Sequence, residues 1–402
     1  MRFDDSELYN IHSSLLGTRQ SLFDLATWKN GLAFKKINFS DSGIPVIKIA
    51  ELNNGIGGTT AYTNQTFSED VHLRKGDLLF SWSGNPETSI DIFRFELEEG
   101  WLNQHIFKVT PNEDLVDRDY FYFIMKYLKP HFTQIATNKQ TTGLGHVTIS
   151  DIKRMSVVLP SLDVQKKIVS YVKPVDDKIK LNSQINENLQ EQAQSIFTQE
   201  FLTLDTIPDG WQESSLLGIA DYLNGLAMQK YRPKDDEQGL PVLKIKELRQ
   251  GSCDSNSELC SPSIKPEYIV HDGDVIFSWS GSLLVDLWCG GTCGLNQHLF
   301  KVTSSTYDKW FYYAWTNHHL QKFAAIAADM ATTMGHIKRE ELAKAEVLIP
   351  SRSDYDRIGG LLAPLYDLVI ANRIENRKLA SLRDELLPQL MSGQLDVSEV
   401  SL

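Results

Sequence analysis

The sequence predicts an α+β protein with two β-rich domains, related by a pseudo-twofold axis and separated by two long antiparallel coiled-coil helices. The first observation behind this prediction is that three segments of the 402-residue chain occur twice. The matching pairs are residues 44–49 and 240–245, residues 76–84 and 273–281, and residues 102–110 and 295–303. The second observation is a heptad pattern that also occurs twice. Solenoid repeats have periods of about 20–50 residues, so a period of about 190 residues indicates a duplicated domain.

Each half begins with a strand-rich block. In the first half, residues 44–49, 77–82 and 106–109 are short runs rich in β-branched and aromatic residues, as expected for strands. Glycine and polar residues separate the runs and favour a curved sheet with long loops. A helical pattern follows at residues 120–133, and its counterpart in the second half covers residues 310–324.

A long amphipathic helix ends each half. Seam residues recur at steps of three and four, which is the pattern of a coiled coil. The seam of the first helix comprises Ile168, Val172, Val175, Ile179, Asn182, Asn186, Leu189, Ala193 and Ile196, and that of the second comprises Ile358, Leu362, Leu365, Val369, Asn372, Asn376, Leu379, Arg383 and Leu386. The two seams are offset by a constant 190 residues, so neither helix has an insertion relative to the other. Pro174 and Pro364 also match, and each is expected to kink or restart its helix.

The order of the segments predicts that the two helices are antiparallel, because the second β-rich block connects the end of the first helix to the start of the second. This direction pairs Asn182 with Asn376, and Asn186 with Asn372. Buried Asn pairs in a coiled coil fix its register at a cost in stability. The alternative is that these four residues face solvent. A helix of about 39 residues would span roughly 58 Å.

We expect four segments along the chain. They are a first domain at residues 1–161, a first spacer helix at 162–203, a second domain at 204–351, and a second spacer helix with the C-terminal tail at 352–402. The charged start of the chain lacks the apolar centre of a signal peptide, and no apolar run approaches the roughly 20 residues of a membrane-spanning helix. We therefore expect a soluble, cytoplasmic protein. The patterns assign no role to the first 20 residues.

The sequence carries no motif of an enzyme active site. It has no G-x-x-x-x-G-K-[ST] loop, no G-x-G-x-x-G sequence after a strand, and no H-E-x-x-H metal motif. Cys253, Cys260, Cys289 and Cys293 all lie in the second half, where reduced thiols are the simpler interpretation and a zinc site is the alternative. We therefore expect a binding protein with no catalytic residues, no cofactor of its own and no metal site.

The duplicated order of domain and helix resembles the specificity (S) subunits of type I restriction–modification systems, over essentially the whole chain after about residue 20. The best local marks are residues 159–168 and 176–182, which are similar to the proline and Gln-x-x-Ile sequence at the start of that family's long helix. The second copy, at residues 350–358, lacks the glutamine. Each motif alone is weak, whereas the repeated order of the segments is specific.

The resemblance implies two target-recognition domains, each of which recognises one half of a bipartite DNA sequence. It implies that the paired helices set the length of the unrecognised gap and bind two methyltransferase (M) subunits, which use S-adenosylmethionine. Restriction (R) subunits that use ATP and Mg would join this complex, which serves in phage defence. The catalysis in such a complex belongs to the partners.

Candidate DNA contacts lie in polar loops that match between the two halves. Arg, Lys, Asn and Gln side chains bind base edges, whereas Lys, Arg, Ser and Thr side chains bind phosphates. The candidates in the first half are Lys29, Asn30, Lys35, Lys36, Ser81, Ser83, Lys139, Thr141, Thr142 and His146, and those in the second half are Asn224, Lys230, Tyr231, Arg232, Lys234, Ser278, Ser280, Thr332, Thr333, His336 and Lys338.

Residues that are identical in both halves are more typical of fold maintenance than of sequence recognition. We therefore expect Trp82 and Trp279 to pack in the core, and His105 and His298 to be core histidines. Discrimination between bases is expected where the halves differ. Those segments are residues 54–71 against 251–269, and residues 85–100 against 282–294. Their divergence predicts two different half-sites and an asymmetric target.

A scaffold protein is the alternative function. In that reading the two β-rich domains would bind protein or glycan ligands on a coiled coil. The net charge of −12 favours the scaffold, because nucleic-acid-binding domains are commonly basic. The constant helix offset and the paired Lys- and Thr-rich loops favour DNA.

Overall fold

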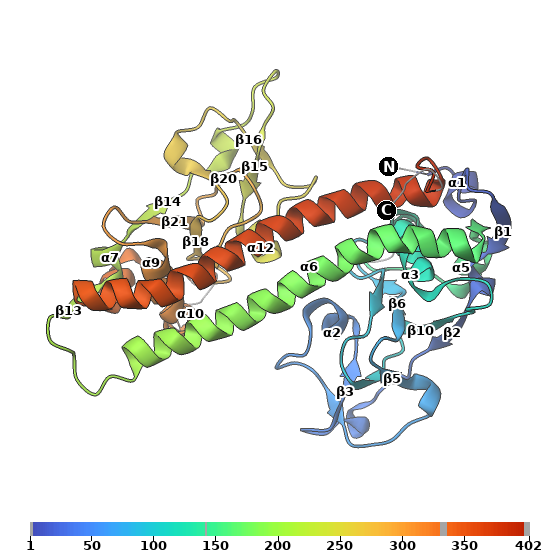
Figure 1. Ribbon diagram of the computed structural model, residues 1–402, viewed down its shortest axis with the longest axis horizontal. Helices are drawn as coiled ribbons and strands as arrows, with labels where there is room; N and C mark the ends of the chain where they lie inside the picture. The colour runs from blue at the N-terminus through green and yellow to red at the C-terminus, as the bar shows by residue number, and fades with distance from the viewer. Residues whose placement is uncertain (1–2, 141–142, 330–335, 398–402) are drawn as a thin grey trace. The chain divides into compact units, whose positions relative to one another are not determined.

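The computed structural model describes residues 3–140, 143–329 and 336–397 (Figure 1). It divides into two compact units, unit 1 with Met1–Asp176 and Ser381–Leu402, and unit 2 with Asp177–Ala380. Helix α6 (Leu162–Phe197) and helix α12 (Arg352–Ser392) each continue from one unit into the other, so both units contain part of both helices. The predicted α+β class is confirmed, with the same β-rich arrangement present twice.

Unit 1 contains two four-stranded sheets. The first is antiparallel with the strand order β2-β10-β6-β8, and the second is mixed with the order β4-β3-β9-β5, in which β3 and β9 are parallel. Strand β1 pairs with β12, and β7 pairs with β11. The strands are β1 Gly17–Ser21, β2 Ala26–Asn30, β3 Ile44–Ile47, β4 Tyr62–Thr63, β5 His72–Arg74, β6 Leu78–Ser81, β7 Ser83–Gly84, β8 Asp91–Arg94, β9 Glu99–Leu102, β10 Ile106–Pro111, β11 Gly145–His146 and β12 Ser156–Pro160. The shorter helices and helical turns are α1 Asp5–Tyr9, η1 Leu22–Leu25, η2 Lys36–Asn38, α2 Ile49–Asn54, η3 Glu69–Val71, α3 Arg118–Tyr127, α4 Lys129–Asn138 and α5 Ile149–Arg154.

Unit 2 repeats this topology. Its antiparallel sheet has the order β14-β21-β18-β19, and its mixed sheet has the order β16-β15-β20-β17, with β15 and β20 parallel. The strands are β13 Gln212–Ser215, β14 Asp221–Asn224, β15 Leu240–Leu243, β16 Leu259–Cys260, β17 Ile269–Val270, β18 Val275–Ser278, β19 Leu284–Leu287, β20 Cys293–Leu295, β21 Leu299–Thr303 and β22 Glu346–Ile349, the last of which pairs with β13. The shorter helices and helical turns are η4 Thr198–Leu202, α7 Leu216–Ile219, η5 Met228–Lys230, α8 Ile245–Gln250, η6 Pro266–Tyr268, α9 Lys309–His318, α10 Leu320–Asp329 and α11 Arg339–Ala343.

The central strands are apolar on both faces because each antiparallel sheet separates two cores. In β6, Leu78 and Phe80 belong to the core under the helices, whereas Leu79 belongs to the core shared with the mixed sheet. In β18, Phe277 and Ile276 divide in the same way between the two cores of unit 2. Strands that are covered on both faces show near-continuous apolar runs rather than alternation. Each β-rich domain is therefore three layers: helices, antiparallel sheet and mixed sheet.

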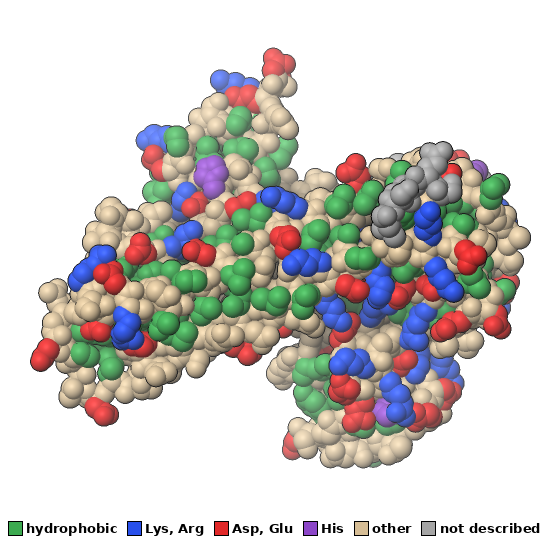
Figure 2. Space-filling view, viewed as in Figure 1, with side chains coloured by type: hydrophobic (Ala, Val, Ile, Leu, Met, Phe, Trp, Pro, Cys, Tyr) green, Lys and Arg blue, Asp and Glu red, His purple; other side chains and the backbone are tan. Residues whose placement is uncertain are grey.

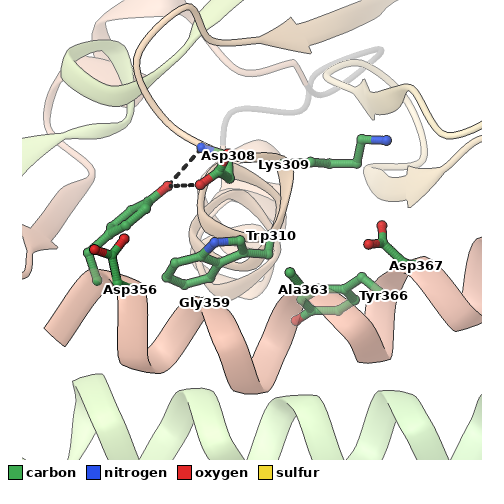
Figure 3. A pocket seen from close by; sticks show the side chains of 9 residues that line it. Asp308, Lys309, Trp310, Asp356, Gly359, Ala363, Tyr366 and Asp367 are labelled. Atoms are coloured by element: carbon green, nitrogen blue, oxygen red, sulfur yellow. Dashed lines mark hydrogen bonds between the residues drawn. The ribbon is translucent and has the colours of Figure 1, made fainter. Parts of the chain in front are cut away.

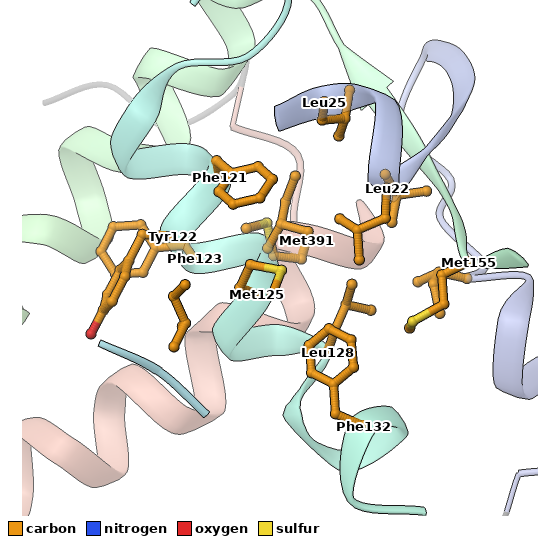
Figure 4. Packing of buried hydrophobic residues seen from close by; sticks show 14 of the residues in the cluster. Leu22, Leu25, Phe121, Tyr122, Phe123, Met125, Leu128, Phe132, Met155 and Met391 are labelled. Atoms are coloured by element: carbon orange, nitrogen blue, oxygen red, sulfur yellow. The ribbon is translucent and has the colours of Figure 1, made fainter. Parts of the chain in front are cut away.

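The two ends of the described chain meet in the core of unit 1. Figure 4 shows Phe121 and Met125 of α3 and Phe132 of α4 packed with Met391, which comes from the end of α12. The backbone N–H of Ser14 donates to the carbonyl of Ser392 at 2.7 Å, and the Ser13 hydroxyl donates to the carbonyl of Met391 at 3.0 Å. The first residues, which the sequence patterns left without a role, thus hold the C-terminal end of α12.

Different residues make the same contact at the start of the two long helices. The side-chain oxygen of Gln165, which is fully buried, accepts the backbone N–H of Asp117 at 2.8 Å. In the second copy, the hydroxyl oxygen of Tyr355 accepts the backbone N–H of Asp308 at 2.7 Å. The missing glutamine of the second copy is therefore replaced by a tyrosine that accepts the matching backbone N–H, and the helix start is preserved.

Two Asn pairs fix how α6 and α12 pair within unit 2. Asn372 donates to the side-chain oxygen of Asn186 at 2.9 Å, and Asn182 donates to that of Asn376 at 2.9 Å. A step of four residues forward along α6, from Asn182 to Asn186, is matched by a step of four residues back along α12, from Asn376 to Asn372. Antiparallel helices require this relation, so the predicted direction and register are confirmed. Asn182, Asn186 and Asn372 are buried. No described residue donates a hydrogen bond to the side-chain oxygen of Asn182, and this unsatisfied buried acceptor lowers the stability of the fold.

Neither proline interrupts its helix, so the expected restart at Pro174 and Pro364 is wrong. Both prolines are exposed, and so are Ser170 and Gly360, the residues four positions earlier. A proline removes one N–H from the helix and leaves the carbonyl four residues earlier unpaired. Because these carbonyls lie on the solvent side, water can bond them and both helices continue. Among the described residues, no helix combines the length and apolar character needed to cross a membrane.

We predict that Asn186→Ala lowers the free energy of unfolding by about 1–3 kcal/mol, because it leaves the buried amide of Asn372 without its acceptor. Urea unfolding followed by helical circular dichroism measures the effect. Asn188→Ala is the matched control, since Asn188 lies on an exposed face of the same helix. Equal midpoints for the two variants would contradict the register role of Asn186.

Candidate nucleic-acid interface

A polar and aromatic cluster lies where strands β2 and β6 end in unit 1. The indole N–H of Trp82 donates to the side-chain oxygen of Asn30 at 3.1 Å, and its ring stacks on Phe107 with centroids 5.7 Å apart. His105 lies beside the indole with a centroid distance of 5.7 Å, and its ring nitrogen bonds the Gln104 amide at 3.1 Å. We call Asn30, Trp82, Gln104 and His105 the first cluster.

Unit 2 contains the same cluster. Trp279 donates to the side-chain oxygen of Asn224 at 2.9 Å and lies 6.2 Å from His298 between ring centroids. The Gln297 amide bonds the His298 ring at 3.3 Å. We call Asn224, Trp279, Gln297 and His298 the second cluster. The two copies share residue types and hydrogen bonds, which extends the duplication from the sequence to the position of individual side chains.

The clusters are surface features. Asn30, Asn224 and His105 are exposed, and His298 and both tryptophans are half-buried. The expectation that His105 and His298 are core histidines is therefore wrong. The buried residues of these turns are instead Asn103 and Asn296, whose side-chain oxygens accept the backbone N–H of His105 and His298. The tryptophans pack one ring face on the core, so their expected packing role is correct in part.

The predicted serine contacts differ in accessibility. Ser81 and Ser278 are fully buried in the central strands, which removes them from the surface that DNA could reach. Ser83 is half-buried and pairs with His146 across β7 and β11. In unit 2, the buried Ser280 bridges to His336 through the backbone, and its hydroxyl bonds the His298 ring at 3.1 Å. The structure thus brings Ser83 and Ser280 to the clusters, together with His146 and His336.

Lys139 has a structural contact. Its ammonium bonds both carboxylate oxygens of Asp151 at 2.6 Å, and Asp151 is almost completely buried. Burial by itself would raise the pKa of Asp151. The hydrogen bonds and charge of Lys139, with hydrogen bonds from Thr148, outweigh burial and hold this pKa below its ordinary value. The buried ion pair accounts for Lys139 without DNA.

The remaining predicted cations fall into two groups. Lys29 pairs with Asp70, and Arg232 pairs with Glu258 at 3.1 Å. The second group is exposed and forms no side-chain ion pair with any described residue; it comprises Lys35, Lys36, Lys230, Lys234 and Lys338. Figure 2 shows Lys and Arg side chains mixed with Asp and Glu over one face of the molecule. Positive charge available to DNA is therefore local, as an acidic chain requires.

Some predictions fall on residues that the structure does not describe. Thr141, Thr142, Thr332 and Thr333 lie outside the described ranges. The divergent segments are described, and most of their residues from 54 to 71 and from 251 to 269 are exposed or half-buried.

Sequence reasoning missed a further matching segment next to each cluster. Residues 30–33 and 224–227 are both Asn-Gly-Leu-Ala. A Cβ on Gly31 would lie 2.1 Å from the carbonyl oxygen of Asn103, and one on Gly225 would lie 2.3 Å from that of Asn296. Only glycine allows the chain to pass this close to the opposite backbone. Alignment of the halves at this short run could have revealed the match.

A pocket of about 360 Å³ lies between α9 and α12 in unit 2. Figure 3 shows Asp308, Asp356 and Asp367 around it, with the Trp310 ring against Gly359. Unit 1 has an ion pair at the matching position, between Asp119 and Lys173 at 3.3 Å. Three carboxylates and one lysine, Lys309, line this pocket, so its net negative charge disfavours phosphate binding.

The cysteines show no sign of a metal site. Among the described residues, no group of three or more His, Cys, Asp or Glu side chains could hold a metal ion. Cys260, Cys289 and Cys293 are buried, and burial raises the pKa of Cys289 to about 11. A thiol with such a pKa remains protonated and unreactive at neutral pH.

Comparison with known proteins gives consistent matches. The family described as "Type I restriction modification DNA specificity domain" matches the chain twice, over residues 19–191 and 208–382. The MjaIX specificity subunit of Methanocaldococcus jannaschii, named as part of a type I restriction enzyme, is 23% identical over 326 residues, covering 74% of this chain and 73% of that protein. The HindI specificity subunit of Haemophilus influenzae is 17% identical over 401 residues, with coverage of 80% and 87%. The solved type I restriction-modification S subunit from M. genitalium has the same fold, with a TM-score of 0.56, 12% identity and coverage of 97% and 98%.

We predict that Lys139→Ala destabilises the protein by about 1–3 kcal/mol at pH 7, because buried Asp151 loses its main partner. The lowered pKa of Asp151 stabilises the fold above the unfolded carboxyl pKa of about 3.9, and this contribution disappears as pH falls through the folded value. The difference in the free energy of unfolding between Lys139→Ala and wild type should therefore be largest at pH 7 and shrink below about pH 4. Urea unfolding across this pH range tests it, with exposed Lys338→Ala as the control. A difference that does not change with pH would contradict the assignment.

Proposed function

Because the chain belongs to the type I restriction modification DNA specificity family, we propose that it is the DNA-recognition subunit of a type I restriction–modification complex. Each of its two domains recognises one half of a bipartite, asymmetric target. The observation that carries this proposal is the family domain present twice, with one surface cluster of the same residues in each copy. The family match favours this function over the alternative of a scaffold for protein or glycan ligands.

The two clusters and the divergent segments have different roles in this proposal. Identical residues cannot distinguish two different half-sites, so the clusters bind what every half-site shares, which is the sugar–phosphate backbone. Exposed amide groups of Asn30 and Asn224 are suitable donors to phosphate oxygens. The bases are recognised by the divergent segments at residues 54–71, 85–100, 251–269 and 282–294, which differ between the domains.

Two methyltransferase subunits bind α6 and α12 in this proposal. Both helices carry large apolar side chains that are about half-exposed, and such positions are common at protein interfaces. They are Leu181 on α6 and Leu361, Leu368 and Leu382 on α12. The chain itself is non-catalytic, so S-adenosylmethionine belongs to the methyltransferase partner, and ATP and Mg belong to a restriction partner.

The proposal predicts that the chain, co-expressed with the methyltransferase encoded beside it, purifies with two copies of that subunit and directs adenine methylation to one asymmetric bipartite sequence. Sequencing of methylated adenines in the host genome identifies the target. Deletion of the gene for this chain is the control and should abolish that methylation. Purification of the chain alone, with methylation unchanged by the deletion, would support the scaffold instead.

A second prediction concerns the gap between the half-sites. Four residues inserted into α6, with four matching residues in α12 to keep the Asn pairs aligned, add about 6 Å of helix. At about 3.4 Å per base pair, the unrecognised gap should lengthen by one to two base pairs while both half-sites stay the same. The same methylation sequencing measures the gap. An unchanged gap in a folded, active variant would show that these helices do not set it.

A further inference from the structure

Each domain presents a short turn next to its cluster. The turns begin after the shared Asn-Gly-Leu-Ala run and contain the helical turns η2 and η5. Ile37 lies seven residues after Asn30, and Tyr231 lies seven residues after Asn224. We call residues 35–38 and 229–232 the two tips. Ile37 and Tyr231 are thus aligned in the sequence, although Ile37 lies inside η2 and Tyr231 directly follows η5.

The tips are held firmly to the clusters. Leu32 and Leu226 form backbone bridges to Asn103 and Asn296, the residues that shape the Gln-His turns. Gln104 and Gln297, members of the clusters, donate their backbone N–H groups to the carbonyls of Leu32 and Leu226 at 2.9 Å. Each tip is therefore fixed relative to the residues proposed to bind the DNA backbone.

The tip side chains are exposed although they are apolar or aromatic. Ile37 is 81% exposed and Tyr231 is 39% exposed. An isolated exposed isoleucine needs no explanation by itself. Here, however, the exposure occurs at aligned sequence positions in both domains, on turns that hydrogen bonds hold in place. In unit 2, Tyr231 also borders an open hollow of about 260 Å³ that is lined by Ser261, Lys265 and Tyr268, so part of its ring is available to a ligand.

Each tip is joined to a divergent segment. The Gln65 side chain donates to the carbonyl oxygen of Ile37 at 3.1 Å, and it accepts from the Asn38 side chain at 2.9 Å. In unit 2, the backbone N–H of Ser261 donates to the carbonyl oxygen of Tyr231 at 2.7 Å. Both Gln65 and Ser261 belong to the segments expected to distinguish bases. The tips therefore lie between the shared clusters and the variable loops.

The charge around both tips suits DNA. Residues 30–40 contain Lys35 and Lys36 and no acidic residue. The aligned residues 224–234 contain Lys230, Arg232 and Lys234 and no acidic residue, and of these Arg232 pairs with Glu258. In a chain with a net charge of −12, two aligned segments that carry cations and no carboxylate of their own are local sites for a polyanion. Lys36 and Lys230, which precede Ile37 and the tyrosine respectively, form no side-chain ion pair with the described residues.

We propose that Ile37 and Tyr231 are specificity-determining residues that contact bases of the two half-sites, while Lys36 and Lys230 bind the adjacent phosphates. The inference deepens the proposed function and rests on it. Apolar side chains contact thymine methyl groups in the major groove or enter between base steps in the minor groove. A different side chain at the aligned position of each domain then contributes to different half-sites. Lys36 and Lys230 bind phosphates of any sequence and so hold Ile37 and Tyr231 against the DNA in the same way.

The test uses the complete complex of this chain with its methyltransferase subunits. The complex selects from a random DNA library, and sequencing gives the preferred target for wild type and variants. Ile37→Ala should lower the discrimination at one position of one half-site about tenfold, which corresponds to about 1.4 kcal/mol. Tyr231→Ala should do the same in the other half-site only, and Tyr231→Phe, which keeps the ring, should retain the preference. Ile207→Ala is the matched control, since Ile207 is exposed but distant in sequence from both tips.

Titrations at several salt concentrations test the lysines. The double variant with Lys36→Ala and Lys230→Ala should weaken binding to all sequences alike. The slope of log K against log salt concentration should become shallower by about 0.9 for each lost phosphate contact. The inference is overturned if wild type selects a bipartite target and both alanine variants at the tips keep it with equal affinity. It is also overturned if Ile37→Ala releases the methyltransferase subunits, because the side chain would then bind protein. A wild-type complex that selects no sequence would instead overturn the proposed function, and this inference with it.

Discussion

Two hydrogen-bonded asparagine pairs determine how the long helices of this protein pair. Apolar seam residues alone would allow α6 and α12 to slide by a heptad, because leucine and isoleucine side chains pack at several registers. The contacts of Asn182 with Asn376, and of Asn186 with Asn372, are satisfied at one register only. Each long helix begins directly after the last strand of a β-rich domain, and the end of α12 packs with the first residues of the chain. Register therefore determines which residues of the helices are available to each unit.

The duplicated domains show which features of the fold tolerate change. Gln165 and Tyr355 are chemically different, yet each accepts the N–H that opens the helix following the antiparallel sheet. The contact of Asp119 with Lys173 in unit 1 is replaced in unit 2 by an open pocket beside Trp310 and Gly359. The backbone N–H that opens this helix has a side-chain acceptor in both copies, although the acceptor differs. A partly exposed ion pair contributes little and can disappear.

Identity between the halves has two causes that only coordinates separate. Asn103 and Asn296 are identical because they satisfy backbone groups in a tight turn, whereas His105 and His298 are identical on an accessible surface next to a tryptophan. Ser81 and Ser278 match as well, but they lie inside the central strands. A repeated residue is therefore a candidate for a shared ligand contact only where it is exposed. The two clusters meet this condition, and the tips beside them carry different side chains, Ile37 and Tyr231, at aligned sequence positions.

The sequence by itself determined the duplication, the α+β class, the two long helices, their antiparallel direction and their Asn register. These features depend on periodicity and chain order, which local residue patterns record directly. The family resemblance also came from the sequence, through residues 159–168 and the order of the segments. Only the tertiary structure decided which polar candidates are accessible. Lys139 is held by buried Asp151, Ser278 is covered by neighbouring strands, and Ile37 stands exposed on a braced turn. Burial and pairing depend on residues far apart in the chain, and no local pattern encodes them.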